Sequence, residues 1–331
     1  MKKIMRGVLL FGMLGGMLLS CGNKKEEKGS QTQAQTKSEE KVFKIGIGQI
    51  VDHPALNDAK QGFKDALNKA GVKAEFEETV ANGEMATQTL QMQQFLKSKK
   101  DLVYAITTPT SQAAKSQITD IPVVIAAVTD PKGAGLVGIS NITGTSGAAP
   151  TKENLEMMRK VFPDAKKIGI IYNSSEQNSV SEVKTLNELA KNYGFEVVEK
   201  AVTNGTELVS AANILVKDID LYYAIQDNTV SSYFPTLLEI TDKHKIPVFA
   251  TNNVYTNRGG LISQGATDYE IGYRAGEIAV EILKNGKKPS EIPIETIKNL
   301  KIEINRKNME MLGIKIPEDV LKEAIFTEDK K

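Results

Sequence analysis

The 331-residue chain contains no tryptophan, one cysteine and two histidines. A single cysteine cannot form an intrachain disulfide or supply a cysteine-based zinc site, and His53 and His244 leave little for a histidine-ligated metal. We therefore expect no metal and no cofactor. The 42 Lys and Arg residues balance 41 Asp and Glu residues to a net charge of +1, and no long basic stripe occurs. Nucleic acid is therefore not an expected partner.

Residues 1–20 have the pattern of an export signal. Basic residues precede an apolar run from Gly7 to Ser20, and Cys21 follows directly. The run is too short to span a membrane as a helix but suits a secretory signal. Its ending, Leu18-Leu19-Ser20-Cys21, resembles the bacterial lipoprotein signal, in which cleavage leaves a lipidated cysteine at the N-terminus. The alternatives are an uncleaved anchor or an ordinary signal peptide with an incidental cysteine.

The lipoprotein interpretation places the mature protein outside the cytoplasm. Cys21 would carry the lipid, and the chain would be exported and anchored to the cell membrane on its periplasmic or outer-surface side. In the segment 21–41, the residues after Cys21 are mainly Lys, Glu, Gln, Ser and Thr, with one Ala and no larger apolar residue. Such a segment cannot bury enough surface to offset its ordering entropy, so we expect a flexible tether.

From Val42 onward, short apolar runs alternate with amphipathic ones. The strand-like runs are residues 42–49, 72–76, 102–106, 121–126, 168–172, 195–199, 221–225 and 246–250. Between the first two, apolar residues recur at helical spacing from Leu56 to Ala70, with Pro54 in the first turn and Gly71 as the stop. This alternation predicts an α/β protein with mostly parallel sheets, and the length favours two domains.

The two halves of this body resemble each other. Three pairs of segments lie at nearly the same offset: Lys44-Ile-Gly-Ile with Lys167-Ile-Gly-Ile, Gly71-Val72 with Gly194-Phe195, and Ile121-Pro-Val with Ile246-Pro-Val. One match alone would be unremarkable in a chain of this size, but three in register indicate a repeat. The period is too long for a solenoid. We therefore predict two similar lobes, each with a doubly wound, mostly parallel sheet.

The segments after the predicted strands are rich in hydroxyl, amide and carboxylate groups and poor in Lys and Arg. They are residues 51–54, 107–111, 128–131 and 143–146 in the first half, and 173–179, 226–229 and 251–253 in the second. Ligands of open α/β sheets bind outside the carboxyl ends of the strands, so two facing lobes would line one cleft with these loops. Helix capping accounts for about one such residue per loop but not for several. The pattern therefore predicts a ligand cleft.

Catalytic motifs are incomplete. Gly46-x-Gly48 lacks the third glycine of a dinucleotide site, residues 133–138 lack the Lys-Ser/Thr of a phosphate loop, and Ala148 interrupts a G-x-S-x-G pattern. His244 lies at a polar helix end, whereas His53 follows a predicted strand beside Pro54 and is the better candidate for ligand contact. We expect no catalytic residue and no enzymatic activity.

Several segments together resemble a known family. They are Asp52-His-Pro-Ala-Leu, Ala105-Ile-Thr-Thr-Pro-Thr-Ser-Gln-Ala-Ala, Val128-Thr-Asp-Pro-Lys-Gly-Ala-Gly-Leu-Val, Ile171-Tyr-Asn-Ser-Ser-Glu-Gln-Asn-Ser-Val and Asp227-Asn-Thr-Val. The chain from Val42 to the C-terminal region is similar to the substrate-binding lipoproteins of ABC importers, of the tryptophan- and aromatic-amino-acid-binding type, which have the periplasmic-binding-protein type 1 fold. It departs from the family pattern at Gly147-Ala-Ala, where an Asp is usual, and at Thr251-Asn-Asn.

The resemblance implies a bilobed, monomeric binder that closes on its ligand and delivers it to an ABC permease with its ATPase subunits. It implies chain crossings near residues 143–150, 250–256 and 295. The first lobe would comprise residues 42–145 and 254–295, and the second 146–253 and 296–331. The ligand would be an amino acid such as tryptophan, phenylalanine or tyrosine.

An amino acid presents opposite charges to its site. Ser174, Ser175, Asn178 and Ser179 could donate to the carboxylate at a helix start. Asp227 is the first choice for the ammonium, with capping of the following helix as the less favoured alternative. The complete predicted set is His53, Thr108, Ser111, Gln112, Thr129, Asp130, Ser146, Asn173, Ser174, Ser175, Asn178, Ser179, Asp227, Asn228 and Asn252.

Other interpretations stay open at this stage. Asp130 could serve an Asp-Pro turn, Ser146 could belong mainly to the crossover, and Tyr104 and Tyr172 are candidates both for pocket walls and for the core. A sugar- or nucleoside-binding protein of the same fold would also present a polar cleft. So would a lipoprotein that senses its ligand rather than delivering it to a transporter.

Overall fold

The computed structural model describes residues 41–329. They belong to one compact unit that begins at Glu40. The predicted signal peptide, Cys21 and all of the predicted tether except Lys41 lie outside the described residues. Within residues 41–329, no helix is long and apolar enough to cross a membrane. The same part of the chain holds no cluster of three or more His, Cys, Asp or Glu side chains placed to bind a metal ion.

Strands and helices alternate along the described chain. The strands are β1 (Phe43–Gln49), β2 (Ala74–Val80), β3 (Leu102–Ile106), β4 (Val123–Val128), β5 (Ile142–Ser146), β6 (Lys167–Asn173), β7 (Glu196–Val202), β8 (Leu221–Ala224), β9 (Val248–Ala250), β10 (Ile262–Gly265), β11 (Glu295–Thr296), β12 (Lys301–Ile304) and β13 (Ile325–Phe326). The α-helices are α1 (Pro54–Lys69), α2 (Met85–Lys97), α3 (Thr108–Gln117), α4 (Thr151–Val161), α5 (Gln177–Ala190), α6 (Gly205–Leu215), α7 (Asn228–Lys243), α8 (Asn253–Asn257), α9 (Asp268–Leu283), α10 (Arg306–Leu312) and α11 (Glu318–Glu323). Every strand predicted from the sequence is present, with ends that differ by a few residues.

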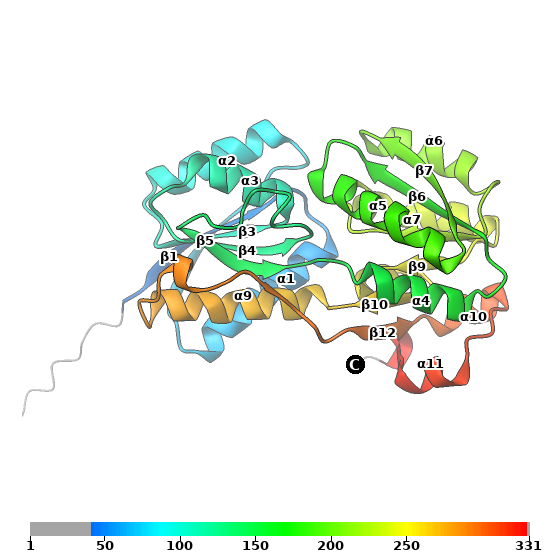
Figure 1. The fold of residues 1–331 in the computed structure, drawn as a ribbon. Coiled ribbons are helices and arrows are strands. Elements are labelled where there is room, and N and C mark those ends of the chain that lie inside the picture. Colours follow the sequence, from blue (N-terminus) through cyan, green and yellow to red (C-terminus); the bar gives the residue numbers. More distant parts are fainter. Residues whose placement is uncertain (1–40, 330–331) are drawn as a thin grey trace, which may run out of the picture. The chain divides into compact units, whose positions relative to one another are not determined.

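The first sheet has the strand order β11-β5-β4-β3-β1-β2, and all its neighbours are parallel. Helices α1 and α9 cover one face around Ile45 and Phe63, and α2 and α3 cover the other around Phe95 and Val103 (Figure 1). Because both faces are covered, the central strands are apolar throughout, as β3 is. This sheet and these four helices are called the first lobe below.

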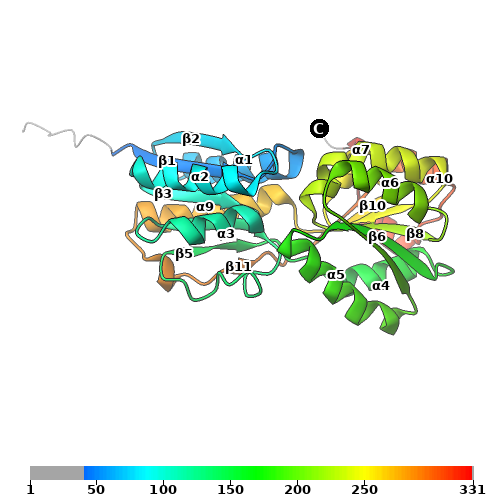
Figure 2. The same ribbon diagram turned by 90° about the horizontal axis from the view of Figure 1, so that it is seen from above.

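The second sheet has the order β13-β12-β10-β9-β8-β6-β7 and is parallel except between β10 and β12. Helices α4 and α5 lie on one face and α6 and α7 on the other (Figure 2). With α8, α10 and α11 this sheet forms the second lobe. Two doubly wound, mostly parallel sheets confirm the predicted fold class.

The internal repeat is a repeat of structure. The Lys44 and Lys167 segments form β1 and β6, each of which lies between two parallel neighbours. Gly71 and Gly194, with φ of 67° and 73°, occupy the left-handed conformation that glycine adopts most readily.

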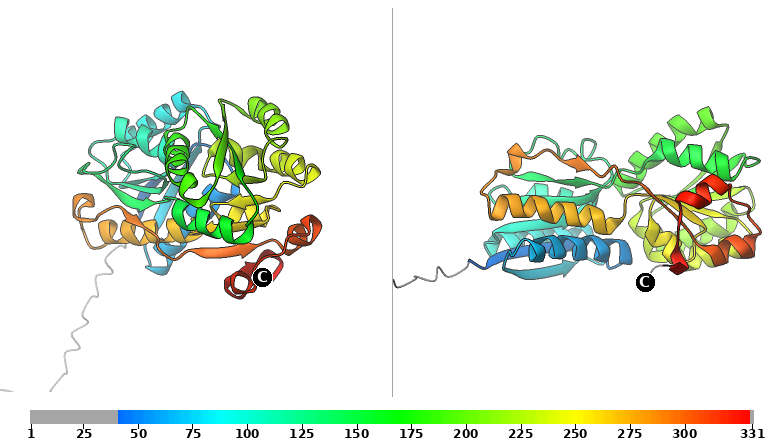
Figure 3. Two further views of the ribbon diagram at one scale, coloured as in Figure 1. Left: turned by 45° about the vertical axis from the view of Figure 1, so that its right-hand side comes forward. Right: turned by 90° about the horizontal axis from the view of Figure 1, so that it is seen from below.

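The chain passes between the lobes three times. The first crossing, between β5 and α4, lies in the predicted segment, and the third follows β11 (Figure 3). The predicted position of the second crossing, residues 250–256, is wrong. Strand β10 pairs with β9 and β12, so residues 254–265 belong to the second lobe and the crossing follows Gly265. Strand β10 is therefore part of the second sheet, and α9, which follows it in the chain, packs on the first sheet.

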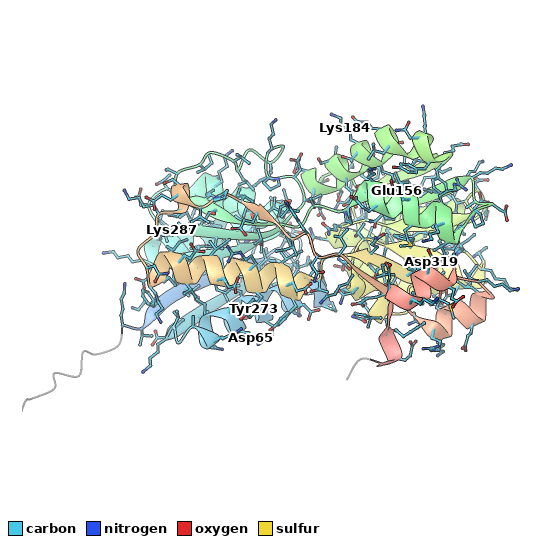
Figure 4. All side chains as sticks on the ribbon, turned by 60° about the horizontal axis from the view of Figure 1, so that its bottom comes forward. Asp65, Glu156, Lys184, Tyr273, Lys287 and Asp319 are labelled. Carbon is cyan, nitrogen blue, oxygen red and sulfur yellow. The ribbon has the colours of Figure 1, made fainter. Side chains whose placement is uncertain are left out.

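Helices α1 and α9 pack unusually closely. A Cβ atom on Gly62 would lie 2.2 Å from the carbonyl oxygen of Tyr269, and one on Gly272 would lie 1.9 Å from that of Ala59. Figure 4 marks Asp65 of α1 and Tyr273 of α9 on these adjoining helices. Only glycine permits such an approach. The contact holds the beginnings of the two helices side by side at the edge of the first lobe that carries the strand-end loops.

Candidate ligand-binding site

A pocket of about 410 Å³, including its open mouth, is lined by strand-end loops of both lobes. The first lobe contributes His53, Ala55, Leu56, Thr107, Ala127, Thr129 and Asp268, and the second contributes Asn178, Gln226, Asp227, Asn228, Ser231, Asn252 and Tyr255. None of these lining residues is Lys or Arg. This site is called the central pocket.

Helix N-termini surround the central pocket. His53, Thr107 and Asp227 are the N-cap residues of α1, α3 and α7, and Asp268 is the first residue of α9. Each terminus presents backbone N–H groups and the positive end of the helix dipole. The pocket therefore offers positive potential to a small anionic group without any cationic side chain on its wall.

Two lining residues have strained backbones. Thr107 and Ala127 have φ of 83° and 54°, values that residues other than glycine rarely adopt. Thr107 follows β3, and Ala127 lies in β4 where the pairing of that strand with β5 shifts register. The N–H of Thr107 donates to Ala126 O at 2.8 Å. The sequence departs from the family pattern at Gly147. A Cβ on this residue would lie 2.9 Å from Ala127 Cα, so a side chain has no room there. Such strain concentrates at functional sites.

Asp227 is buried and already has donors on both oxygens. Its Oδ2 accepts from Asn173 N at 2.6 Å and from Ser179 Oγ at 2.7 Å, while Oδ1 accepts from Val230 N at 2.8 Å. These bonds cap α7 and tie it to β6 and α5. Burial raises the pKa of Asp227 above its ordinary value, although the hydrogen bonds oppose the shift. The capping role, one of the two alternatives considered for this residue, is present.

Asp268 lies on the opposite side of the central pocket and is 5 % exposed. Its Oδ2 has no hydrogen-bond partner among the described residues. Burial raises the pKa of Asp268 to about 8, and the nearby Asp58 adds to the shift. A buried carboxylate oxygen without a partner is costly, so a cationic or hydrogen-bond-donating ligand group would relieve the cost.

His53 joins the two lobes. Its Nε2 lies 3.3 Å from Asn228 Oδ1, and Asn228 Nδ2 donates to Glu176 Oε2 at 2.5 Å. This orientation of the amide puts the proton of a neutral His53 on Nε2 and leaves Nδ1 as an acceptor, for which the described part of the chain provides no partner. Burial lowers the pKa of His53 to about 4, so the ring is neutral at pH 7.

Two further hydrogen bonds cross between the lobes. Thr129 Oγ1 lies 3.3 Å from Gln226 Oε1, and Ser181 Oγ donates to Asp130 Oδ2 at 2.9 Å. With the His53–Asn228 bond they bring the strand-end loops of both lobes into direct contact. The predicted convergence of these loops is therefore present in the structure.

The second lobe carries two more carboxyl groups beside the pocket, Glu182, which is buried, and Glu176, which is half-buried. Burial raises the pKa of Glu182 to about 8, and burial together with the charge of Asp227 raises that of Glu176 to about 7. Glu182 Oε2 accepts from Gln226 N at 3.2 Å, whereas Oε1 has no partner among the described residues. This side of the cleft is unfavourable for a ligand's anionic group.

The predicted residues fall into three groups. His53, Thr129, Asn178, Asp227, Asn228 and Asn252 line the central pocket. Asp130 and Ser146 line a hollow on one side of it, and Gln112, Asn173 and Ser175 line a hollow on the other. Thr108, Ser111, Ser174 and Ser179 line neither the pocket nor these two hollows.

The last group has local roles or surroundings that the sequence did not reveal. Ser111 Oγ donates to Thr107 O at 2.7 Å, and Ser179 Oγ supports Asp227. Ser174 is exposed, and Thr108 Oγ1 is buried with no hydrogen-bond partner in the part of the chain that the structure describes. Tyr104, a candidate for the pocket wall, instead stacks on Phe63 in the core with ring centroids 3.9 Å apart.

Besides Ala55 and Leu56, six residues that line the central pocket were not predicted: Thr107, Ala127, Gln226, Ser231, Tyr255 and Asp268. Thr107 and Gln226 lie within loops that the polar pattern had already marked. Asp268 could have been found from Thr267 and Glu270, a capping box that starts a helix after a strand. Ser231 and Tyr255 lie within helices, where no local signal separates pocket from core.

Comparison with known proteins shows the family of the chain. Residues 44–327 match the family model described as ABC transporter substrate binding protein. A tyrosine-binding protein of Clostridioides difficile is 37 % identical, over 100 % of this chain and 98 % of the relative.

Two solved structures are also similar. An ABC domain in complex with L-Trp from Streptococcus pneumonia has 33 % identity and a TM-score of 0.81, covering 85 % of this chain and 99 % of that one. The ligand-free, open structure of a substrate-binding protein with adhesive properties from Clostridium difficile has 38 % identity and a TM-score of 0.66, covering 86 % and 99 %. The chain belongs to the ABC transporter substrate-binding protein family and has the periplasmic-binding-protein type 1 fold.

Proposed function

We propose that this protein captures an aromatic amino acid, tyrosine or tryptophan, in the central pocket and delivers it to an ABC permease and its ATPase subunits. The observation that carries the proposal is the composition of that pocket. Helix N-termini and buried carboxyl groups meet there, and no lining residue is Lys or Arg. A site of this kind suits a zwitterion better than a ligand with net charge.

The two charges of an amino acid would be treated differently. Its carboxylate can accept from hydroxyl and backbone N–H groups at the helix starts, among them Thr107 Oγ1, which has no partner among the described residues. Its ammonium can donate to the buried acceptors of the pocket. A neutral sugar would satisfy neither charge preference and would leave a buried carboxyl oxygen unpaired.

The aromatic side chain is supported by the pocket walls and by the relatives. Ala55, Leu56, Ala127 and Tyr255 provide apolar surface against which a ring can pack. The relative at 37 % identity is named for tyrosine binding, and the structure at 33 % identity holds L-Trp. An aromatic amino acid is therefore the ligand class that best matches both the walls and the polar groups.

Capture by lobe closure is supported by the contacts between the lobes. The chain has a higher TM-score with the L-Trp complex than with the open, ligand-free structure, 0.81 against 0.66, although its identity to the former is lower. Three hydrogen bonds at the cleft join the lobes, as does the ion pair of Lys301 of β12 with Glu270 of α9 at 2.7 Å. Closure of this type is driven by ligand contacts that exist only in the closed state.

A binding experiment tests the ligand. We would unfold and refold the purified protein to remove any bound ligand, then measure thermal unfolding with a panel of amino acids, sugars and nucleosides. A ligand at a hundred times its dissociation constant stabilises the native state by about 2.7 kcal/mol. We expect a shift with tyrosine or tryptophan and none with sugars. Stabilisation by sugars or nucleosides alone would refute the proposed ligand class.

A cellular experiment tests transport and anchoring. Cells without the protein should take up labelled tyrosine or tryptophan more slowly, and the wild-type chain should restore uptake. In the proposed monomeric lipoprotein, Cys21→Ser should prevent incorporation of a labelled fatty acid and release the protein from the membrane. Normal uptake without the protein would favour ligand sensing over delivery.

A further inference from the structure

We propose that Asp268, rather than Asp227, binds the ammonium group of the ligand. This assignment rests on the proposed function, because it names the partner of one charge of the amino acid. Both carboxyl groups line the central pocket and both are buried, at 5 % and 2 % exposure. They differ in how many of their oxygens are already used by the protein.

Asp227 has little capacity left. Its Oδ2 holds Asn173 N and Ser179 Oγ, and its Oδ1 holds Val230 N. Two of these three donors are backbone groups fixed by β6 and α7, so they cannot turn away when a ligand enters. An ammonium group at Asp227 would share oxygens whose charge the protein already neutralises in part.

Asp268 has the opposite character. Its Oδ2 is buried and has no partner within residues 41–329, and the hydrogen bond that its carboxyl accepts comes from its own backbone. The second carboxyl nearby, Asp58, increases the negative potential at this position. A buried acceptor with unsatisfied capacity gains most from a charged donor, since the cost of its desolvation is already incurred in the folded protein.

The surroundings supply the other acceptors that an ammonium group needs. Such a group has three donors. His53 Nδ1 and Asn178 Oδ1 line the same pocket, are buried, and have no partner among the described residues. Asp268 and His53 come from the beginnings of α9 and α1, which the glycine contacts between these helices hold side by side. The acceptors of the first lobe are therefore placed by rigid elements rather than by loops.

The test compares a ligand with its analogue that lacks the ammonium group. We would measure by titration calorimetry the affinities of tyrosine and of 3-(4-hydroxyphenyl)propionate for the wild-type protein and for Asp268→Asn. The substitution preserves shape but cannot form the carboxylate that an ammonium group would stabilise. We expect the tyrosine affinity to fall roughly 10–100-fold and the affinity for the analogue to change little. The preference for tyrosine over the analogue should therefore largely disappear.

Two further variants make the result specific. Asp65→Asn, on the same helix pair but outside the pocket, should leave both affinities unchanged. Asp268→Ala serves if Asp268→Asn does not fold, and thermal unfolding without ligand verifies the fold of each variant.

The outcomes separate the two proposals. If Asp268→Asn keeps the wild-type preference for tyrosine, the assignment is wrong and the proposed function stands. If tryptophan binds but tyrosine does not, indole-3-propionate replaces the analogue and the same comparison applies. If the wild-type protein binds only ligands without an ammonium group, both the function and the assignment fail.

Discussion

Glu182 provides the sharpest test of the electrostatics of the cleft. This residue of α5 is 3 % exposed, and one of its oxygens has no partner. Burial raises the pKa of its carboxyl from 4.5 to about 8, so the native state retains a proton that the unfolded chain loses. Stability falls with pH wherever the native state binds more protons. Wild-type protein should therefore lose stability relative to Glu182→Gln as pH rises from 4.5 to 8.

The size of the effect follows from the pKa difference. Each unit of difference is worth about 1.4 kcal/mol, so the change between pH 5 and pH 8 has an upper limit of about 4 kcal/mol. Relaxation around the ionised group reduces this limit, and we expect roughly 2–4 kcal/mol. For a chain of this size such a difference corresponds to a change in Tm of roughly 5–10 °C.

The assay is thermal or urea unfolding of both proteins at several pH values between 5 and 8. The difference in stability between the two proteins cancels the contribution of every other titrating group. One such group is His53, whose contribution to stability changes with pH in the opposite direction. Glu188→Gln, an exposed change on the same helix, is the control and should give a curve parallel to wild type. If the wild-type and Glu182→Gln curves are also parallel, the carboxyl is not held protonated and the reasoning is refuted.

Three other changes test separate features of the structure. Asp227→Asn should destabilise the protein by about 1–3 kcal/mol in urea unfolding, because an amide cannot accept on both sides as the carboxylate does; an unchanged midpoint would argue against its capping role. Gly272→Ala should cost several kcal/mol, because its methyl group would lie 1.9 Å from Ala59 O; full stability would contradict the close contact of α1 with α9. Wild-type protein should lose roughly 2–3 kcal/mol relative to His53→Gln as pH falls from 6.5 to 4, because burial lowers the pKa of His53 to about 4; parallel pH curves would show that the ring is not held neutral.

The features predictable from the sequence are those set by local pattern. Strand β3 was predicted with its observed ends, because an apolar run between turn residues has few alternatives. The repeat was visible because β1 and β6 occupy equivalent positions and retain Lys-Ile-Gly-Ile. By contrast, β10 was missed and with it the second crossing, since its place in the second sheet depends on pairing with β12, far along the chain.

The site shows the same division. Polar loops predicted where a pocket would form, and six of the predicted residues line it. Which carboxyl group is available was not predictable, because Asn173 and Ser179 reach Asp227 from elements more than forty positions away in the sequence. Only the three-dimensional arrangement shows that Asp227 is satisfied and Asp268 is not. A residue's type indicates what it can bind, whereas its neighbours determine what capacity remains.

The division of acceptors between the lobes connects binding to closure. Asp268 and His53 belong to the first lobe, whereas Asn178 belongs to the second. Three hydrogen bonds at the cleft join the lobes, in addition to the Lys301–Glu270 ion pair. Two of them are 3.3 Å long, and neutral bonds of this kind contribute about 0.5–1.5 kcal/mol each. A ligand that contacts acceptors on both sides adds free energy only when the lobes are together, and it can therefore shift the equilibrium toward the closed state. Asp268 follows directly after the second crossing, so a charge bound there acts where the lobes are joined.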